Sequence, residues 1–268
     1  MVEDGLERAR RLAADGDVEG AARVLADYVE AAPDDAFAHF QLANLMLARG
    51  DAAGAIERFE RALALEPDNT VVHNDLGTAL EKLGREEDAA EAYGRAARSR
   101  PPYPPAQYNL ALLHGRRGQW HEAAELLRAA VDQTQGFRAA RLELGLVLRR
   151  LGREDAARAC FDTLLADDPR DLETRRAIAA SDMGQCRFAD AAEHLERCLS
   201  LAPNDAKTIL ALGSCLQELG RVDEALAHYR RLLARDRSRY YEVVKKLTSA
   251  STGCFWVNAA ALRRALLG

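Results

Sequence analysis

The side chains most often used for nucleophilic, acid–base or metal chemistry are sparse, with six histidines and five cysteines in 268 residues. His114 and His121 are separated by an Arg-Arg-Gly turn, so they lack the i, i+4 spacing of a helical metal pair. The chain contains no GxxxxGK[ST] phosphate loop, no GxSxG nucleophile elbow and no HExxH helix. We therefore expect no enzymatic activity, no cofactor and no metal site.

The cysteines are odd in number and include no CxxC pair, which predicts neither a disulfide framework nor a zinc site. Cys160, Cys198 and Cys215 occupy helix positions where small apolar residues are expected, so they are predicted to pack in the core. Cys186 and Cys254 are better candidates for exposed thiols. We expect all five to stay reduced.

Charge is distributed unevenly along the chain, whose net charge is −5. Residues 1–69 carry 15 acidic and 7 basic side chains, whereas residues 206–268 carry 5 acidic and 11 basic ones. Either these are solvated helix faces that differ in charge, or the two ends steer partners or associate head to tail. An acidic chain without a broad basic face argues against nucleic-acid binding.

No segment approaches the roughly 18 to 20 uninterrupted apolar residues of a membrane-spanning helix. The start, MVEDGLERAR, lacks the charged-then-apolar pattern of a signal peptide. We therefore expect a cytoplasmic protein with no membrane insertion. Strong helix formers (Ala, Leu, Arg and Glu) dominate the composition, which predicts an all-α fold.

Three sets of residues recur at an interval of 34, the sequence signature of a repeat protein. The first set is glycine, interrupted only by Cys186: Gly16, Gly50, Gly84, Gly118, Gly152 and Gly220. The second is alanine: Ala21, Ala55, Ala89, Ala123, Ala157, Ala191 and Ala225. The third is proline, with Gln135 and Arg237 as exceptions: Pro33, Pro67, Pro101, Pro169 and Pro203. Because the three sets keep the same phase, they indicate repeated helical hairpins.

Each set has a role in such a hairpin. Glycine can adopt the left-handed conformation that ends the first helix and reverses the chain. Alanine lets the two helices cross closely, since a larger side chain would overpack the crossing at a cost of about 1 to 3 kcal/mol. Proline separates one hairpin from the next. One hairpin cannot bury both of its faces, so we expect stacked neighbours to stabilise the array.

This pattern resembles the tetratricopeptide repeat family, in which Leu-Gly is followed by Ala, an aromatic residue, Ala and Pro at fixed offsets. The seventh position of the units holds Leu42, Leu76, Leu110, Leu144, Ile178 and Leu212, and the eighth is always Ala or Gly. The resemblance predicts seven units, at 2–35, 36–69, 70–103, 104–137, 138–171, 172–205 and 206–239. It implies an all-α, right-handed superhelical solenoid, with residues 240–268 as a C-terminal capping helix and tail.

The sequence departs from the family pattern at two places. The usual tryptophan of position four is replaced by polar residues, which predicts wetter hairpin openings: His39, His73, Gln107, Arg141 and Arg175. In the sixth unit Asp182 occupies a normally apolar position. Either this unit is a flexible interface, because a buried carboxylate without a partner is costly, or Asp182 is exposed and has no dynamic role.

The tail begins with YYEVVKKL, which is expected to form a helix over the last hairpin, and Asn258 is a candidate cap for a final helix. Phe255, Trp256 and Val257 form its densest apolar run. These three residues either pack on the seventh hairpin or dock into a partner or another copy.

The resemblance also implies that the first helices line a concave face, with positions two, five, nine, twelve and thirteen pointing inward. The matching residues are Phe37, Phe40, Asn44, Leu47, Val71, Asn74, Thr78, Tyr108, Leu112, Arg116, Leu142, Leu146, Arg149, Arg150 and Arg176. This groove is apolar and then increasingly basic, which suits a peptide with hydrophobic anchors and an acidic stretch. Leu142 and Leu146 have an alternative interpretation as contacts between hairpins.

Some family members hold a chaperone's acidic C terminus with a clamp of lysines, asparagines and arginine, which no three units here supply. We therefore expect a non-enzymatic adaptor or scaffold that binds a partner's peptide segment in the concave groove. One alternative is an accessory or targeting subunit that presents substrates to an enzyme, as such repeats do beside glycosyltransferases. Another is a self-assembling structural scaffold.

Overall fold

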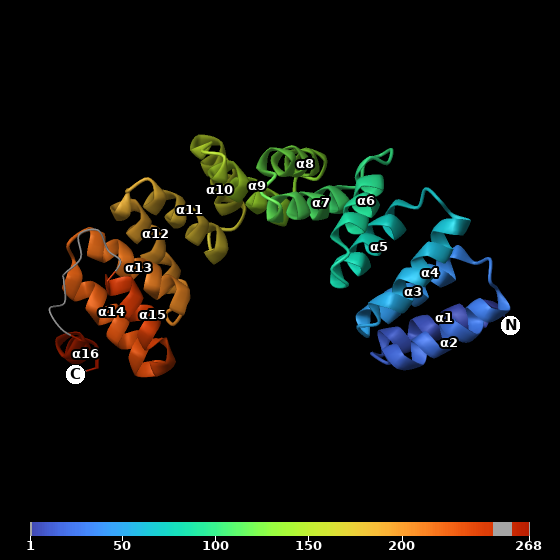
Figure 1. Ribbon diagram of the computed structural model, residues 1–268, viewed down its shortest axis with the longest axis horizontal. Coiled ribbons are helices and arrows are strands. Elements are labelled where there is room, and N and C mark those ends of the chain that lie inside the picture. Colours follow the sequence, from blue (N-terminus) through green and yellow to red (C-terminus); the bar gives the residue numbers. More distant parts are fainter. Residues whose placement is uncertain (1, 249–258, 268) are drawn as a thin grey trace. The chain divides into compact units, whose positions relative to one another are not determined.

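The computed structural model describes residues 2–248 and 259–267, where 16 α-helices and one 3-10 helix occur and no strand does. Consecutive helices lie antiparallel in pairs (Figure 1), which confirms the all-α array of helical hairpins. The helices are α1 (Val2–Ala14), α2 (Val18–Ala31), α3 (Ala36–Ala48), α4 (Ala52–Leu65), α5 (Thr70–Lys82), α6 (Glu86–Ala97), α7 (Pro104–Arg116), α8 (Trp120–Gln133), α9 (Arg138–Arg150), α10 (Glu154–Asp167), α11 (Leu172–Gly184), α12 (Phe188–Leu201), α13 (Ala206–Glu218), α14 (Val222–Arg235), η1 (Arg237–Arg239), α15 (Tyr240–Thr248) and α16 (Ala259–Leu267).

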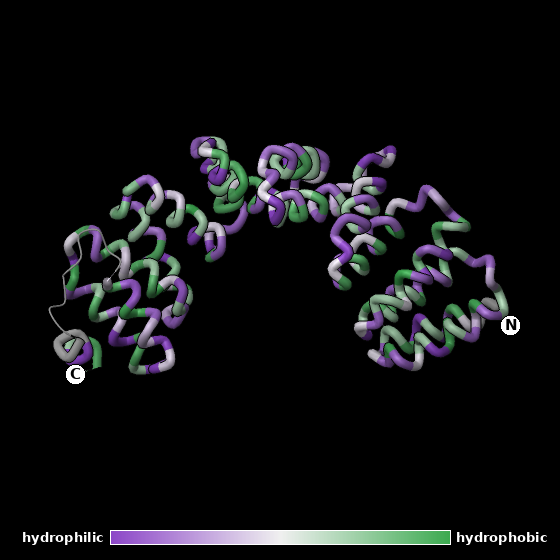
Figure 2. Tube along the Cα trace, viewed as in Figure 1, coloured by the Kyte–Doolittle hydropathy of each residue, from purple (hydrophilic) through white to green (hydrophobic). Residues whose placement is uncertain are grey.

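Contacts divide the chain into two units, residues 1–140 and 141–268, and the boundary falls inside α9. In the first unit α1 pairs with α2, α3 with α4, α5 with α6 and α7 with α8. In the second, α11 pairs with α12 and α13 with α14. Apolar and polar residues alternate along the helices (Figure 2), as expected of helices that bury one face against a neighbour.

The glycines end the first helices as predicted. All six of the 34-residue set have positive φ values, between 71° and 89°. In the second hairpin the Gly50 N–H donates to the Leu47 carbonyl at 3.1 Å, and the Asp51 N–H donates to the Met46 carbonyl at 2.9 Å. These bonds satisfy carbonyls that the end of α3 leaves without helical partners. Cys186 adopts the same left-handed conformation, with φ of 59°, although it has a side chain.

All seven alanines of the second set are fully buried, which confirms the predicted close crossing of the paired helices. A second rule governs the same crossing. Where the eighth position is glycine, an aromatic ring fills the space that a methyl group would need. The three pairs are Gly77 with Tyr93, Gly145 with Phe161, and Gly213 with Tyr229.

The residues that replace the family tryptophan do not make the hairpin openings wetter, and this expectation was wrong. His39 and His73 are buried, and the Nε2 atom of each ring lies within 3.0 Å of the carbonyl of the preceding turn proline. Because a carbonyl only accepts, Nε2 carries the proton in both rings. Arg175 repeats the arrangement, donating from Nη2 to the Pro169 carbonyl at 2.7 Å. In these three repeats the polar side chain therefore ties the first helix to the turn before it.

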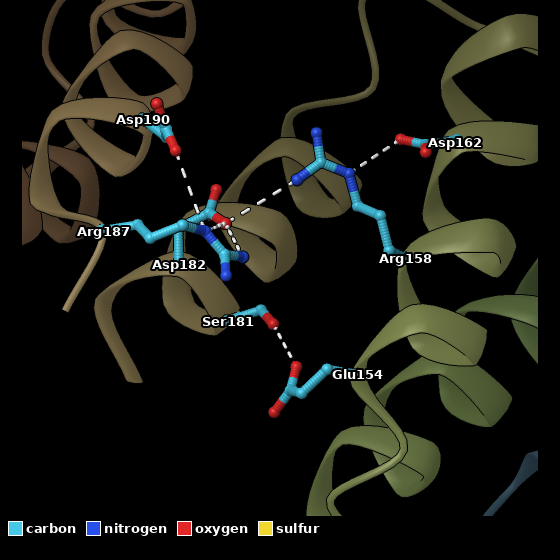
Figure 3. Close-up of polar contacts among 7 residues, drawn as sticks. All are labelled: Glu154, Arg158, Asp162, Ser181, Asp182, Arg187 and Asp190. Atoms are coloured by element: carbon cyan, nitrogen blue, oxygen red, sulfur yellow. Dashed lines mark hydrogen bonds and ion pairs between the residues drawn. The ribbon is translucent and has the colours of Figure 1, made fainter. Parts of the chain in front are cut away.

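The interpretation of Asp182 as an exposed residue was wrong, because its carboxylate is fully buried. The premise of the flexible interface, a buried carboxylate without a partner, does not hold either, and flexibility of the sixth unit stays a prediction. Asp182 lies at the end of α11, where its Oδ1 atom accepts from Arg187 Nε at 3.1 Å (Figure 3). The same oxygen lies 3.6 Å from Arg158 Nη1 of α10. Next to it, Ser181 Oγ donates to Glu154 Oε2 at 2.5 Å. Two polar contacts thus join the fifth and sixth repeats at a normally apolar position.

The segment YYEVVKKL forms α15 and packs on α13, as expected, with Val243 and Leu247 in the core. Helix α16 packs on α14 and buries Leu266. The expectations for Phe255, Trp256, Val257, Asn258 and Cys254 concern residues outside the described part of the chain. Of the remaining cysteines, Cys198 and Cys215 are buried, Cys160 is half-buried and Cys186 is exposed.

Candidate peptide-binding surface

An aromatic cluster lies at the start of α3, where Asp35 caps the helix by accepting from the Ala38 N–H at 3.0 Å. Phe37 is 43% exposed, a large value for an aromatic side chain in a folded helix. Its ring centroid lies 6.5 Å from that of Phe40, which in turn lies 6.2 Å from that of the buried Phe59. Phe40 is half-buried against the core, so Phe37 is the member of the cluster that faces solvent.

Beside Phe37 lies a small cavity of about 130 Å³ between the first helices of the first two hairpins. Its wall consists mainly of apolar side chains: Leu6, Ala9, Ala13, Leu25, Phe37 and Leu45. Two polar side chains, Arg10 and Gln41, complete the wall. The Arg10 guanidinium lies 5.6 Å from the centroid of the Phe37 ring, within the range of a cation–π contact.

Sequence reasoning missed the part of this cavity that α1 supplies. Leu6, Arg10 and Ala13 occupy the fifth, ninth and twelfth positions of the first unit, which are positions that the family resemblance directs inward. The same rule applied to the first unit would have found them.

A chain of polar side chains crosses the first compact unit, residues 1–140, from α3 to α7. Asp75 accepts hydrogen bonds from Asn44 and from Asn74 Nδ2, and Asn109 Nδ2 donates to Asn74 Oδ1 at 3.0 Å. Burial raises the pKa of the Asp75 carboxyl, and the two amide donors oppose that shift. Asp75 and Asn109 were not predicted. Their signal is a polar residue at the sixth position of successive units, also seen at Gln41 and Glu143.

The other predicted residues of the first unit differ in exposure. Val71 is 39% exposed at the start of α5, whereas Asn74 is buried in the polar chain just described. Leu47, Thr78, Tyr108 and Leu112 are half-buried, and the Tyr108 ring lies 5.3 Å from the Phe137 ring. Phe37 and Val71 are therefore the predicted apolar residues that offer most surface to a partner.

Arg116 is exposed, but two carboxylates of the same unit already neutralise it. Its guanidinium forms an ion pair with Glu81 and lies 4.0 Å from Glu86. Glu81 also accepts a hydrogen bond from the Tyr93 hydroxyl at 2.9 Å. An acidic ligand would have to compete with both carboxylates for this arginine.

In the second compact unit, residues 141–268, the predicted surface is only partly accessible. Leu142 is 4% exposed, so its side chain packs inside the array, whereas Leu146 and Arg149 are half-buried and Arg150 is exposed. Arg149 has no ion pair with any described residue. On the same helix, burial and the neighbouring Glu173 raise the pKa of the half-buried Glu143 carboxyl.

Arg176 also has an internal partner, since its Nη1 atom lies 2.9 Å from Asp205 Oδ2. Burial acts to raise the pKa of Asp205, but hydrogen bonds from Thr208 and the contact with Arg176 outweigh it and hold this pKa below its ordinary value. Among Arg116, Arg149 and Arg176, only Arg149 has no ion pair with a described residue, so it is the most available of the three to a ligand.

Within residues 2–248 and 259–267, no group of three or more His, Cys, Asp or Glu residues is arranged to hold a metal ion. The helices of those same residues include none that combines the length and apolar character needed to cross a bilayer. What the surface does offer is an exposed ring, an apolar cavity and charged groups at its edge, a combination that suits the side chains of a peptide.

Comparison with known proteins identifies the repeats. Two family models described as tetratricopeptide repeat match the chain. One matches residues 46–113 and 183–247, and the other matches residues 6–69 and 108–171. The mouse protein O-mannosyl-transferase TMTC1 is 31% identical over 100 residues, which is 36% of this chain and 11% of that protein. The chain thus spans only about a tenth of the length of this curated relative.

Solved structures share the fold at low sequence identity. A tetratricopeptide repeat protein from Parabacteroides merdae has a TM-score of 0.67 and 18% identity, covering 91% of this chain and 98% of its own. PilF of Pseudomonas aeruginosa has a TM-score of 0.65 and 20% identity, with coverage of 82% and 96%. YrrB, described as a TPR protein with an unusual peptide-binding site, has a TM-score of 0.61 and 20% identity, with coverage of 71% and 97%. The chain belongs to the tetratricopeptide repeat family.

Proposed function

We propose that this protein is a non-enzymatic adaptor that binds a peptide segment of a partner protein on the face formed by its first helices. The observation that carries the proposal is the exposed Phe37 ring, which borders an apolar cavity and lies under the Arg10 guanidinium. An aromatic anchor beside an apolar pocket with a charged edge is typical of the residues that dominate protein–protein binding. Proteins of this repeat family generally act as adaptors, which supports the same class of function.

The ligand fits best as a segment with apolar anchors and some acidic residues. A small apolar side chain can enter the cavity of about 130 Å³ while a neighbouring carboxylate approaches Arg10. In the second unit Arg149 offers a guanidinium without an internal ion partner among the described residues. Arg116 and Arg176 contribute less, because a ligand must displace their own carboxylates, whereas Arg10 has only a looser, exposed pair with Glu7 at 3.9 Å.

Quantitative affinity purification of the tagged protein and two variants tests this proposal. Phe37→Ala removes an exposed ring, and Arg149→Glu reverses a charge. Each should reduce capture of the same partner several-fold. Phe37→Ala is a cleaner change than Phe40→Ala, because Phe40 supports the core. Glu57→Gln on the outward side of α4 is the control. Partners captured equally by all four proteins would contradict the proposal.

A second candidate function is that of an accessory subunit presenting substrates to an enzyme. The observation in its favour is the similarity to part of an O-mannosyl-transferase. The test is to purify a glycosyltransferase with this protein bound, and then to repeat the purification from cells that lack this protein. An enzyme that stays catalytically active but no longer binds its protein substrate would favour the accessory subunit over a simple adaptor.

Self-assembly is a third candidate, favoured by the opposite charges of residues 1–69 and 206–268. Added salt should dissolve an assembly held together by these charges, because at 0.1 M ionic strength the attraction between exposed charges more than about 10 Å apart is largely screened. Light scattering that shows one monomeric mass at every salt concentration would exclude this candidate.

A further inference from the structure

A second cavity lies on the other side of the second and third repeats, between their second helices. It has a volume of about 380 Å³, in the size range of small-ligand and side-chain pockets. Helix α5 forms its floor with Leu76 and Leu80, while α4 contributes Leu63 and Ala64. None of these residues belongs to the peptide-binding surface proposed above.

The 34-residue register explains why this cavity exists. Ala92 lines it from α6, at a position where each other hairpin carries a larger residue: Val24, Arg58, Leu126, Cys160, His194 and His228. The register position of Leu76 shows the consequence. Its equivalents Leu42, Leu110, Leu144, Ile178 and Leu212 are all buried, but Leu76 is only half-buried. The small Ala92 side chain leaves this one apolar interface open.

The charges around the opening determine what kind of group it can accept. Arg85 is held by Asp88, with 2.7 Å between Nε and Oδ2, and Arg95 by Glu91, with 2.7 Å between Nη2 and Oε1. All four of these residues line the cavity. The fifth charged residue is Glu60, an exposed carboxylate on α4 that has no hydrogen bond or ion pair with any described residue. The opening therefore has one carboxylate to spare and no unpaired cation.

We propose that this cavity is a second docking site, which takes a large apolar side chain of a partner protein next to a lysine or arginine. The apolar side chain covers Leu63, Leu76 and Leu80, and the adjacent cation pairs with Glu60. Complementarity of charge selects this partner, since an acidic segment would meet the unpaired carboxylate. The site lies on the second helices, so it can be occupied while a peptide is bound to the first helices.

Methyl NMR of the full chain, labelled at leucine, tests the site with the dipeptide acetyl-Leu-Arg-amide. The probe should shift the Leu63 and Leu76 methyl signals saturably. Acetyl-Gly-Arg-amide, which lacks the apolar side chain, should bind at least about tenfold more weakly. Acetyl-Leu-Glu-amide should also bind several-fold more weakly, because it brings a like charge to Glu60.

Two variants localise the binding. Ala92→Leu, which copies Leu126 of the next repeat, should fill the cavity and abolish the methyl shifts. Glu60→Gln should weaken binding of the cationic probe several-fold, whereas Glu57→Gln on the same helix should leave it unchanged. Should Ala92→Leu fail to fold, Glu60→Arg provides an exposed charge reversal that should abolish binding.

Four results would overturn the proposal. The cationic probe could leave the leucine methyl signals unmoved, or it could bind Ala92→Leu as tightly as the unaltered protein. The acidic probe could bind as tightly as the cationic one. A dimer that light scattering detects and that Ala92→Leu abolishes would assign the cavity to a second copy of the chain instead of a basic partner. None of these results depends on Phe37, so they are independent of the test of the first-helix face.

Discussion

At the residue scale, the crossing of the third, fifth and seventh hairpins leaves little room for change, because a glycine and an aromatic ring share it. A Cβ atom added at Gly145 would lie 2.4 Å from Phe161 Cε1, and the Phe161 ring is fully buried. We expect Gly145→Ala to lower the free energy of unfolding by about 1 to 3 kcal/mol. This loss should outweigh the gain of about 1 kcal/mol in helix propensity.

The chain itself supplies the rescue for this variant. The fourth and sixth units combine alanine at the eighth position with leucine at the position of the ring, as in Ala111 with Leu127. The loss in free energy of unfolding of the Gly145→Ala, Phe161→Leu double variant should therefore be smaller than the sum of the losses of the two single variants. Urea unfolding of the four proteins, followed by circular dichroism, measures this coupling. Strictly additive effects would contradict the packing account.

The buried carboxylate of Asp182 makes a second prediction, which concerns its partner. Arg187→Ala leaves the carboxylate buried with only the more distant Arg158, so stability should fall by about 2 kcal/mol or more. Asp182→Leu restores the residue found at the equivalent Leu148 and Leu216 and should be neutral or stabilising. In the Asp182→Leu background, Arg187→Ala should cost little. Thermal unfolding of the double-mutant cycle checks this, and an equal cost in both backgrounds would argue against the ion pair.

The pH dependence of stability reports on Asp75, because burial raises the pKa of this carboxyl. A raised pKa means that the folded state binds the proton more readily than the unfolded state, so this residue destabilises the fold at neutral pH. That penalty disappears as the pH falls through the raised pKa towards the ordinary value of about 4. Asp75→Asn, which keeps a carbonyl acceptor for Asn44 and Asn74, should be more stable than the unaltered protein at pH 7. The difference should shrink by pH 4, and a difference that grows on acidification would contradict this account.

At the scale of elements, the order of the helices could be predicted because the residues that start, cross and end each hairpin lie within the same 34-residue repeat. Glycine at the turn, alanine at the crossing and proline between hairpins are sequence signals, and the glycine dihedrals and alanine burial confirm two of them. The partners of Asp182 could not be predicted in this way. Arg158 lies 24 positions earlier in the sequence, and only packing of α10 on α11 shows that it reaches the carboxylate.

The candidate sites show the same limit. Family positions identified Phe37 and Val71, whose exposure the structure demonstrates, but did not distinguish them from the buried Leu142. The outer cavity depends on a residue that is small where its equivalents are large, so Ala92 is informative only by comparison with the other repeats. An alignment of the seven units could have shown the difference, but not that it leaves a space.

Helix α15 provides an element-scale prediction, because it covers the last hairpin. Val243 and Leu247 are buried in the core shared with α13 and α14, and Gln217 Nε2 donates to the Leu247 carbonyl at 3.4 Å. Replacing both apolar residues by serine should destabilise this end by about 2 to 5 kcal/mol. Hydrogen exchange should accelerate in α13 and α14 and remain unchanged in α3 to α6, since repeats are stabilised by their neighbours. Tyr241→Ser is the control, because Tyr241 is 83% exposed. Equal acceleration along the chain would contradict local capping.

At the scale of the whole molecule, the two proposed sites lie on different helices, one on the first helices of the first two repeats and the other between the second helices of the second and third repeats. The first-helix face presents Phe37 beside Arg10, and the opposite side presents an apolar cavity beside Glu60. The two sites differ in the sign of their charged group, so they should select acidic and basic segments respectively. A protein with two such sites is suited to hold two partners together, which is the work of a scaffold.

Site-specific photo-crosslinking tests the central claim most directly. A benzoylphenylalanine introduced at Phe37 or Val71 places a reactive aromatic group on the proposed binding face, and the same residue at Glu57 on α4 is the control. The account predicts that a partner protein is crosslinked from the first two positions, through one short segment with apolar and acidic residues, and not from the third. Capture of that same acidic segment mainly from Glu57, or equally from all three positions, would contradict it.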